Sequence, residues 1–236
     1  MTRCFFTAIL CVLLFSSAFL EAEEFIYKHR AGDKYRILST VREDVYLDRR
    51  LSHRALIFNR IAVTVEGPSG DPGRGRSRLS AVFDTAETAQ SSPAGGENRG
   101  FSWARGYRSV FDRDELGFIY IDRQYFMPVV RNVPVFPRRD IKPGESWTAE
   151  GHEAHDFRDS FGIPDPYRIP FTANYRYLGD REWKGKLYPA IEVSYRIQND
   201  SAEARGELWP RRIRGSSDQT IFWDRELGQP RFYRER

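Results

Sequence analysis

Alternating apolar and polar residues run through most of this sequence, and this pattern limits the fold more than any other feature. Segments rich in β-branched and aromatic residues stand between turns that contain Gly, Pro or Asp, which is typical of strands joined by short connections. No long apolar pattern repeats every 3.6 residues, as an amphipathic helix would require. The sequence therefore predicts a mainly β fold. We expect antiparallel strands in two curved sheets, forming a sandwich or a half-open barrel with long loops.

The longest expected hairpin covers residues 34–65 and turns at LDRRLS. The other expected strands cover residues 78–87, 101–111, 117–126, 146–150, 169–178, 188–197 and 219–224, with a last one beginning at RFYRER. Two stretches rich in Gly, Pro and Ser, residues 66–77 and 88–100, are expected to be loops.

A short repeated motif indicates a two-part organisation. AGDKY (31–35) and PGESW (143–147) each place a Gly with φ above zero in a turn before an aromatic residue enters a strand. The Pro-rich strap 128–142 lies between them and is too apolar to be a flexible linker. The sequence thus predicts one β module with possible halves at 23–127 and 143–236, joined by this strap.

The first residues, MTRCFFTAILCVLLFSSAFLEAEEF, have the pattern of a secretory signal peptide, with Arg3 before an apolar run and small residues after it. The run is shorter than the ~20 apolar residues of a membrane anchor. Cleavage after Ala18 or Ala22 suits the pattern, and we expect removal of residues 1–22. Both cysteines lie in this segment, so residues 23–236 have no thiol for a disulfide, a zinc site or nucleophilic attack.

The formal net charge of +4 is modest for a protein of this length. Aromatic and Arg residues interleave in FSWARGYRSVF and ELWPRRIRGSS, a pattern that can clamp single-stranded nucleic acid. The same pattern is typical of a strand whose Arg stems cover apolar surface. Because no nucleic-acid-binding motif accompanies it and the chain is expected to be exported, we expect no nucleic-acid partner. No second apolar run is long enough for a transmembrane helix.

The strongest candidate for chemistry is EGHEAHDFRDSFGIPDP, which brings His152, His155, Asp156 and Asp159 close together in sequence. Imidazole and carboxylate groups at short spacing can hold a divalent metal that activates water. However, the two histidines are three residues apart, and on an extended strand this spacing puts them on opposite faces. We therefore expect no metal site, and these four residues are only weak candidates.

Other catalytic patterns are missing from the sequence. It has no Gly-rich phosphate loop, no nucleophile elbow around a Ser, and no pair of carboxylates that spacing alone assigns to glycoside hydrolysis. We therefore expect that the chain is not an enzyme, with no catalytic residue and no cofactor.

Several longer motifs resemble the amino-terminal β region of spirochaetal, Treponema-type OmpA-family envelope proteins. They are AGDKYRILSTVREDVY, IFNRIAV, YFMPVVRNVPVFPRRDIKPGESW, HDFRDSFGIPDPY and WDRELGQPRFYRE. The resemblance implies more β structure and then an OmpA-like domain after Arg236, so that this chain is a fragment or a truncated relative. In the family that domain binds peptidoglycan through an Asp and an Arg, and neither can be placed here. Peptidoglycan is thus expected as a partner only through that later domain.

These observations together predict a non-enzymatic exported β module of a cell-envelope protein, with a structural or interaction role. We expect it in the periplasm, associated with the outer membrane and with other envelope components. Two alternatives stay open: a periplasmic carrier or sensor that holds an apolar ligand between curved sheets, and a metal-dependent hydrolase that uses the His152 loop.

Overall fold

The computed structural model describes residues 22–47, 50–70, 75–91, 100–200, 210 and 212–235. Strands account for most of them, and α1 (Arg158–Phe161) is a single helical turn. The strands are β1 (Lys34–Leu47), β2 (Arg50–Pro68), β3 (Ser77–Ser91), β4 (Gly100–Arg113), β5 (Ile119–Ile121), β6 (Val130–Arg131), β7 (Ser146–His155), β8 (Tyr167–Trp183), β9 (Lys186–Asp200), β10 (Arg212–Asp224) and β11 (Gln229–Glu235). The predicted fold class is confirmed. The expected signal peptide lies outside the described residues, apart from Ala22.

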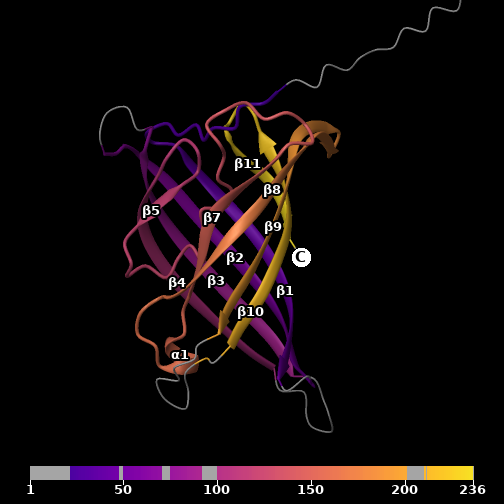
Figure 1. The fold of residues 1–236 in the computed structure, drawn as a ribbon. Coiled ribbons are helices and arrows are strands. Elements are labelled where there is room, and N and C mark those ends of the chain that lie inside the picture. Colours follow the sequence, from indigo (N-terminus) through magenta and orange to yellow (C-terminus); the bar gives the residue numbers. More distant parts are fainter. Residues whose placement is uncertain are drawn as a thin grey trace, which may run out of the picture.

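The strands form two antiparallel meanders. The first sheet has the order β1-β2-β3-β4-β5, and the second has the order β11-β10-β9-β8-β7-β6. Figure 1 shows the first sheet from indigo to magenta and the second from coral to yellow, as two layers on opposite sides of the molecule. One of the sheets curls strongly, like half of a barrel. Over the described residues, no helix has the length and hydropathy that a bilayer span requires.

Several expected strands are longer than predicted, such as β7, which continues to His155, and two other stretches differ more. The strand expected at 117–126 is only the three-residue β5, because the Asp122 carboxylate accepts a 3.0 Å hydrogen bond from the Gln124 backbone N–H and turns the chain. The loop expected at 88–100 is shorter, because β3 continues to Ser91. Within that stretch, residues 92–99 lie outside the described part of the chain.

Each sheet has its own buried cluster. The larger one lies on the second sheet and is rich in aromatic residues: Phe25, Tyr27, Phe136, Ile141, Ile169, Phe171, Ala173, Tyr175, Tyr177, Ile191, Val193, Tyr195, Ile197, Ile221 and Trp223. The smaller one lies on the first sheet: Val63, Val65, Leu79, Ala81, Phe83, Phe111 and Ile119. Burial of apolar side chains therefore stabilises the second sheet more than the first.

The segment before β1 and the Pro-rich strap join these clusters. The Phe25 ring, from the first segment, stacks on the Phe136 ring of the strap at a centroid distance of 5.1 Å. The Tyr27 and Phe136 backbone N–H groups donate hydrogen bonds of 2.7 and 2.9 Å to the carbonyl oxygens of Glu115 and Leu116. Both connecting segments thus contact the turn between β4 and β5 while their rings enter the core of the second sheet.

The same backbone pattern opens both sheets. Gly32 and Gly144 have φ angles of 88° and 90°, as the repeated motif predicts. Gly32 N–H donates to the Val65 carbonyl (2.8 Å), and Val65 N–H returns a bond to the residue after Gly32; Gly144 and Tyr177 make the equivalent two bonds. Val65 and Tyr177 also each precede a register shift in their strands. The same number of residues separates Gly32 from Gly144 and Val65 from Tyr177. The opening turn, its two hydrogen bonds and the register shift therefore occur at corresponding positions in both sheets.

Candidate functional site

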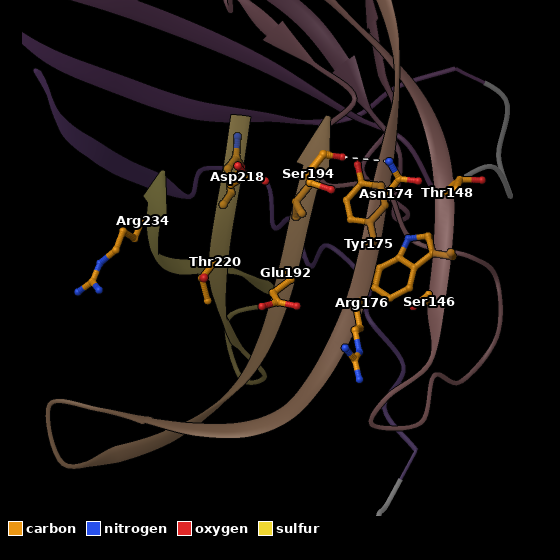
Figure 2. A pocket seen from close by; sticks show the side chains of 13 residues that line it. Ser146, Thr148, Asn174, Tyr175, Arg176, Glu192, Ser194, Asp218, Thr220 and Arg234 are labelled. Atoms are coloured by element: carbon orange, nitrogen blue, oxygen red, sulfur yellow. Dashed lines mark hydrogen bonds between the residues drawn. The ribbon is translucent and has the colours of Figure 1, made fainter. Parts of the chain in front are cut away.

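The second sheet carries a trough of about 830 Å³ lined mostly by residues with polar side chains. It crosses five strands, β7 to β11, and Figure 2 shows its lining side chains. The lining residues, which define the trough, are Ser146, Trp147, Thr148, Asn174, Tyr175, Arg176, Glu192, Val193, Ser194, Asp218, Gln219, Thr220 and Arg234.

Strict alternation explains why this face is polar. Along β8, Ala173, Tyr175 and Tyr177 are buried, whereas Asn174 and Arg176 are exposed. Successive side chains of a strand point to opposite faces, so the aromatic residues enter the core and the polar ones face outward. The polar side chains of the trough therefore lie on the outer face of the sheet, whereas Tyr175 and Val193 of its lining belong to the aromatic cluster on the other face.

Strand register arranges three charged groups of the trough, Arg176, Glu192 and Arg234, in a row. Arg176 lies opposite Glu192, Glu192 opposite Thr220, and Thr220 opposite Arg234, so two guanidinium groups flank one carboxylate. Residues directly opposite each other in antiparallel strands have their Cβ atoms ~5 Å apart. The row thus offers both signs of charge across four strands.

A second row runs beside the first and is mostly uncharged. It places Thr148 opposite Asn174, Asn174 opposite Ser194, and Ser194 opposite Asp218. Asn174 Nδ2 donates a 3.4 Å hydrogen bond to the Ser194 carbonyl, drawn as the dashed line in Figure 2. Hydroxyl and amide groups in this row can both donate and accept hydrogen bonds.

The end of the β8–β9 hairpin bends over the neighbouring strands β10 and β11. A register shift between Tyr177 and Asp180 bends the hairpin, and Figure 1 shows its curled end at the upper right. Beyond the bend, the Trp183 ring stacks on Phe232 at 4.9 Å and lies 6.5 Å from Phe222. Because these two rings belong to β11 and β10, the hairpin end lies over the outer face of those strands.

The trough presents charged and hydrogen-bonding groups on its surface. Its carboxylates, Glu192 and Asp218, and its cations, Arg176 and Arg234, lie on an open, hydrogen-bonding surface. A polar partner with alternating charges can form ion pairs and hydrogen bonds there, whereas an apolar ligand would leave these groups without partners.

The acidic members of the predicted His152 loop are held by arginines. Asp156 accepts hydrogen bonds from Arg158 Nε (2.8 Å), Tyr107 Oη (2.9 Å) and Arg105 Nη1 (3.2 Å). The bond from Arg158 is the main cause that lowers the pKa of Asp156 far below its usual value. Asp159 also pairs with Arg105. Because Arg105 belongs to β4, these contacts tie the first sheet to the loop that follows β7.

The two histidines expected in that loop lie in strand β7, which continues to His155, and their surroundings differ. His155 Nε2 lies 2.9 Å from a Glu153 carboxylate oxygen, and its ring stacks on Phe157 at 5.2 Å. His152 lies opposite Arg131 of β6, and burial together with the charges of Arg131 and Arg168 lowers its pKa to about 4. In the described part of the chain, no group of three or more His, Cys, Asp or Glu side chains is arranged to hold a metal ion.

Arg131 is the residue of this region that the sequence did not single out. Its side chain is fully buried, although it stands among valines in the apolar strap. Its Nε donates a 3.0 Å hydrogen bond to the Pro128 carbonyl, and its Nη2 donates to the Tyr125 carbonyl. The only signal in the sequence is one Arg inside the apolar run VVRNV.

Comparisons of the chain with protein-family models, with curated proteins and with solved structures found no match.

Proposed function

We propose that this chain is a non-enzymatic, exported β module of a cell-envelope protein that binds an envelope component through the trough. The observation that supports this most is the trough itself, a hydrogen-bonding surface with both signs of charge on the outer face of a well-packed sheet. Binding residues held on a rigid scaffold lose little conformational freedom on binding.

The proposed location is the periplasm, in association with the outer membrane. Two observations support it: the signal-peptide pattern of residues 1–22 and the motifs that resemble spirochaetal OmpA-family envelope proteins. In this proposal the described β module supplies recognition. Attachment to peptidoglycan would come from a separate OmpA-like domain of the kind that follows this region in that family.

The alternative of an apolar-ligand carrier has less support. Such a carrier needs an enclosed apolar hollow between its sheets. Most residues that line the trough have polar side chains, and these side chains lie on the outer face of the second sheet. Aromatic rings such as Phe25, Phe136 and Trp223 fill the space beside that sheet's inner face.

The test is retention of the purified exported chain by an envelope fraction of the source cells. The double variant Arg176→Ser, Glu192→Ser removes the centre of the charged row, and we expect it to bind at least about tenfold more weakly, from the loss of charge-assisted contacts. Arg196→Ser is the matched control, because Arg196 is an exposed arginine of the same sheet outside the trough. Equal retention of the double variant and the unmodified chain would refute the trough as the binding surface.

A further inference from the structure

Three buried nitrogen atoms on one face of the second sheet, near its β6 edge, lack a hydrogen-bond partner: Arg131 Nη1, His152 Nε2 and Arg168 Nη2. Buried polar atoms are almost always hydrogen-bonded, and leaving one unpaired costs about 1–3 kcal/mol. Three such atoms on neighbouring basic side chains therefore need an explanation that the described residues do not supply.

Strand register brings these three side chains together. Arg131 of β6 lies directly opposite His152 of β7, so both point to the same face. Ala154 lies opposite Arg168 of β8, which makes Arg168 the diagonal neighbour of His152 on that face. Each of the three therefore has another of them as a direct or diagonal neighbour across the strands.

The charges in the cluster are not balanced by a paired carboxylate. Arg131 is held only by the backbone carbonyls of Tyr125 and Pro128. Burial, then the charge of Arg168, lowers the pKa of Arg131 to about 10. Burial, then Arg123, also lowers the pKa of Arg168, and Asp122 opposes both effects. Among the described residues no carboxylate forms an ion pair with Arg131 or Arg168.

We propose that Arg131, His152 and Arg168 form a binding site for a small oxyanion of the phosphate or sulfate type. The three unpaired nitrogens would donate hydrogen bonds to its oxygens, and the two guanidinium groups would neutralise its charge. A doubly charged tetrahedral oxyanion fits two arginines better than a singly charged carboxylate does. Because the three atoms are closed to solvent, binding requires a small outward shift of the residues that cover Arg131.

This site is independent of the trough. The trough lining contains none of Arg131, His152 and Arg168. If the trough variants bind the envelope fraction normally, the proposal of an oxyanion site still stands. If no oxyanion binds, the proposal that the trough is a binding surface still stands.

The first experiment measures thermal unfolding of the exported chain in phosphate, sulfate, acetate and chloride at constant ionic strength. A ligand at ten times its Kd raises Tm by about 3–6 °C for a protein of this size. We expect such a shift in phosphate and sulfate, but not in acetate or chloride. Glycerol phosphate added in place of inorganic phosphate distinguishes a phosphate group on a larger molecule from the free ion.

The variant Arg168→Gln should abolish the phosphate-dependent shift, while the exposed control Arg196→Gln should keep it. Arg168 is chosen because Arg131 also holds two backbone carbonyls, so its replacement would disturb the fold directly. Should Arg168→Gln fail to fold, ³¹P NMR line broadening of phosphate by the unmodified chain, reversed by sulfate, gives a direct reading. An equal shift in all four salts, or no broadening, would show that buried water satisfies these nitrogens and would overturn the proposal.

Discussion

On its inner face, the first sheet has a row of hydrogen-bonded polar side chains, whereas the corresponding positions of the second sheet are occupied by Gly151 and an aromatic residue. In the first sheet Asn59 Nδ2 donates to Ser39 Oγ (3.1 Å), and Thr85 Oγ1 donates to Asn59 Oδ1 (2.8 Å). The number of residues between Gly32 and Gly144 also separates Ser39 from Gly151 and Asn59 from Phe171. Gly151 and Phe171 are therefore the positions of the second sheet that correspond to Ser39 and Asn59.

Gly151 and Phe171 illustrate how the second sheet fills these positions. A Cβ at Gly151 would lie 2.6 Å from the Phe171 ring, so glycine leaves the room that the ring needs. Phe171 in turn stacks on Tyr195 at 4.0 Å. Aromatic packing has thus replaced a hydrogen-bonded row on an otherwise shared strand plan.

The two sheets therefore differ in how much apolar surface they bury: the second sheet has the larger core and the first sheet the smaller one. The second sheet buries many large rings and carries the trough on its other face. The first sheet has a smaller core and is tied to the second through Arg105 and through the segment before β1. The proposed recognition surface therefore lies on the sheet with the larger core, which holds its side chains in place.

The largest expected effect is the loss of a ring from the second core. Trp223 is 1% exposed and lies edge-on to Tyr27 at 5.0 Å and to Phe136 at 4.9 Å. Trp223→Ala should lower the free energy of unfolding by about 3–5 kcal/mol, through lost burial and the cavity left behind. Urea denaturation followed by circular dichroism measures this loss.

The comparison between the sheets predicts a smaller loss for Phe83→Ala, since the core of the first sheet has fewer rings around Phe83. Phe58→Ala, at a ring that is 46% exposed, is the control and should change stability by less than about 0.5 kcal/mol. If Phe83→Ala cost more than Trp223→Ala, the assignment of the main core to the second sheet would be wrong.

The next effect tests whether the two opening turns are equivalent. Gly32 and Gly144 both have positive φ, and a Cβ at either would meet no atom within 4 Å. Gly32→Ala and Gly144→Ala should therefore each cost about 1–2 kcal/mol from backbone strain alone. Chemical denaturation of both variants, with Gly106→Ala as a control without positive φ, checks this. Unequal costs would show that the shared hydrogen bonds do not make the turns equivalent.

A smaller effect is expected at the contact between the sheets. Arg105→Met removes the bonds to Asp156 and Asp159 but leaves Asp156 paired with Arg158, so the expected loss is about 1 kcal/mol. Arg78→Met, which breaks a pair in which the Arg side chain is 53% exposed, should cost less than about 0.5 kcal/mol. A null effect at Arg105 would mean that this contact does not hold the sheets together.

The strands could be predicted because period-two alternation is local. The segment 169–178 was expected as a strand from its sequence, and it lies inside β8. The trough could not be predicted, because exposed polar residues occur on the outer face of any half-buried sheet. The bend after Tyr177, which lets Trp183 reach across to Phe232 on another strand, was not expected either. The Gly within YLGDREW is the one local signal of such a bend.

The buried Arg131 was missed for a different reason. Its partners are backbone carbonyls, which leave no mark in the sequence, and the valines around it indicated an apolar strap. The His152 loop shows the converse: closely spaced His and Asp residues indicated a shared site, but its carboxylates pair with Arg105, whereas His152 lies opposite Arg131. Proximity in sequence does not determine which face of a strand a side chain occupies.

The last expected effect is a pH dependence contributed separately by the two regions. His29, in the segment before β1, and His152, in the second sheet, both have a pKa lowered from 6.5 to about 4. Burial is the main cause in each case, followed by Arg113 for His29 and by Arg131 for His152. The unfolded chain therefore binds these protons more tightly, so stability is fully present above about pH 6.5 and falls as the pH drops towards 4.

His152→Gln and His29→Gln should each flatten this decline, which denaturant unfolding at pH 7, 6, 5 and 4 measures. Flattening by both variants would show that each region contributes its own buried neutral histidine. Flattening by His152→Gln alone would place the proton-sensitive contact in the second sheet, beside Arg131, and make the two regions differ in pH response as well as in packing. A decline in His152→Gln as steep as in the unmodified chain would show that His152 is not held neutral by its surroundings.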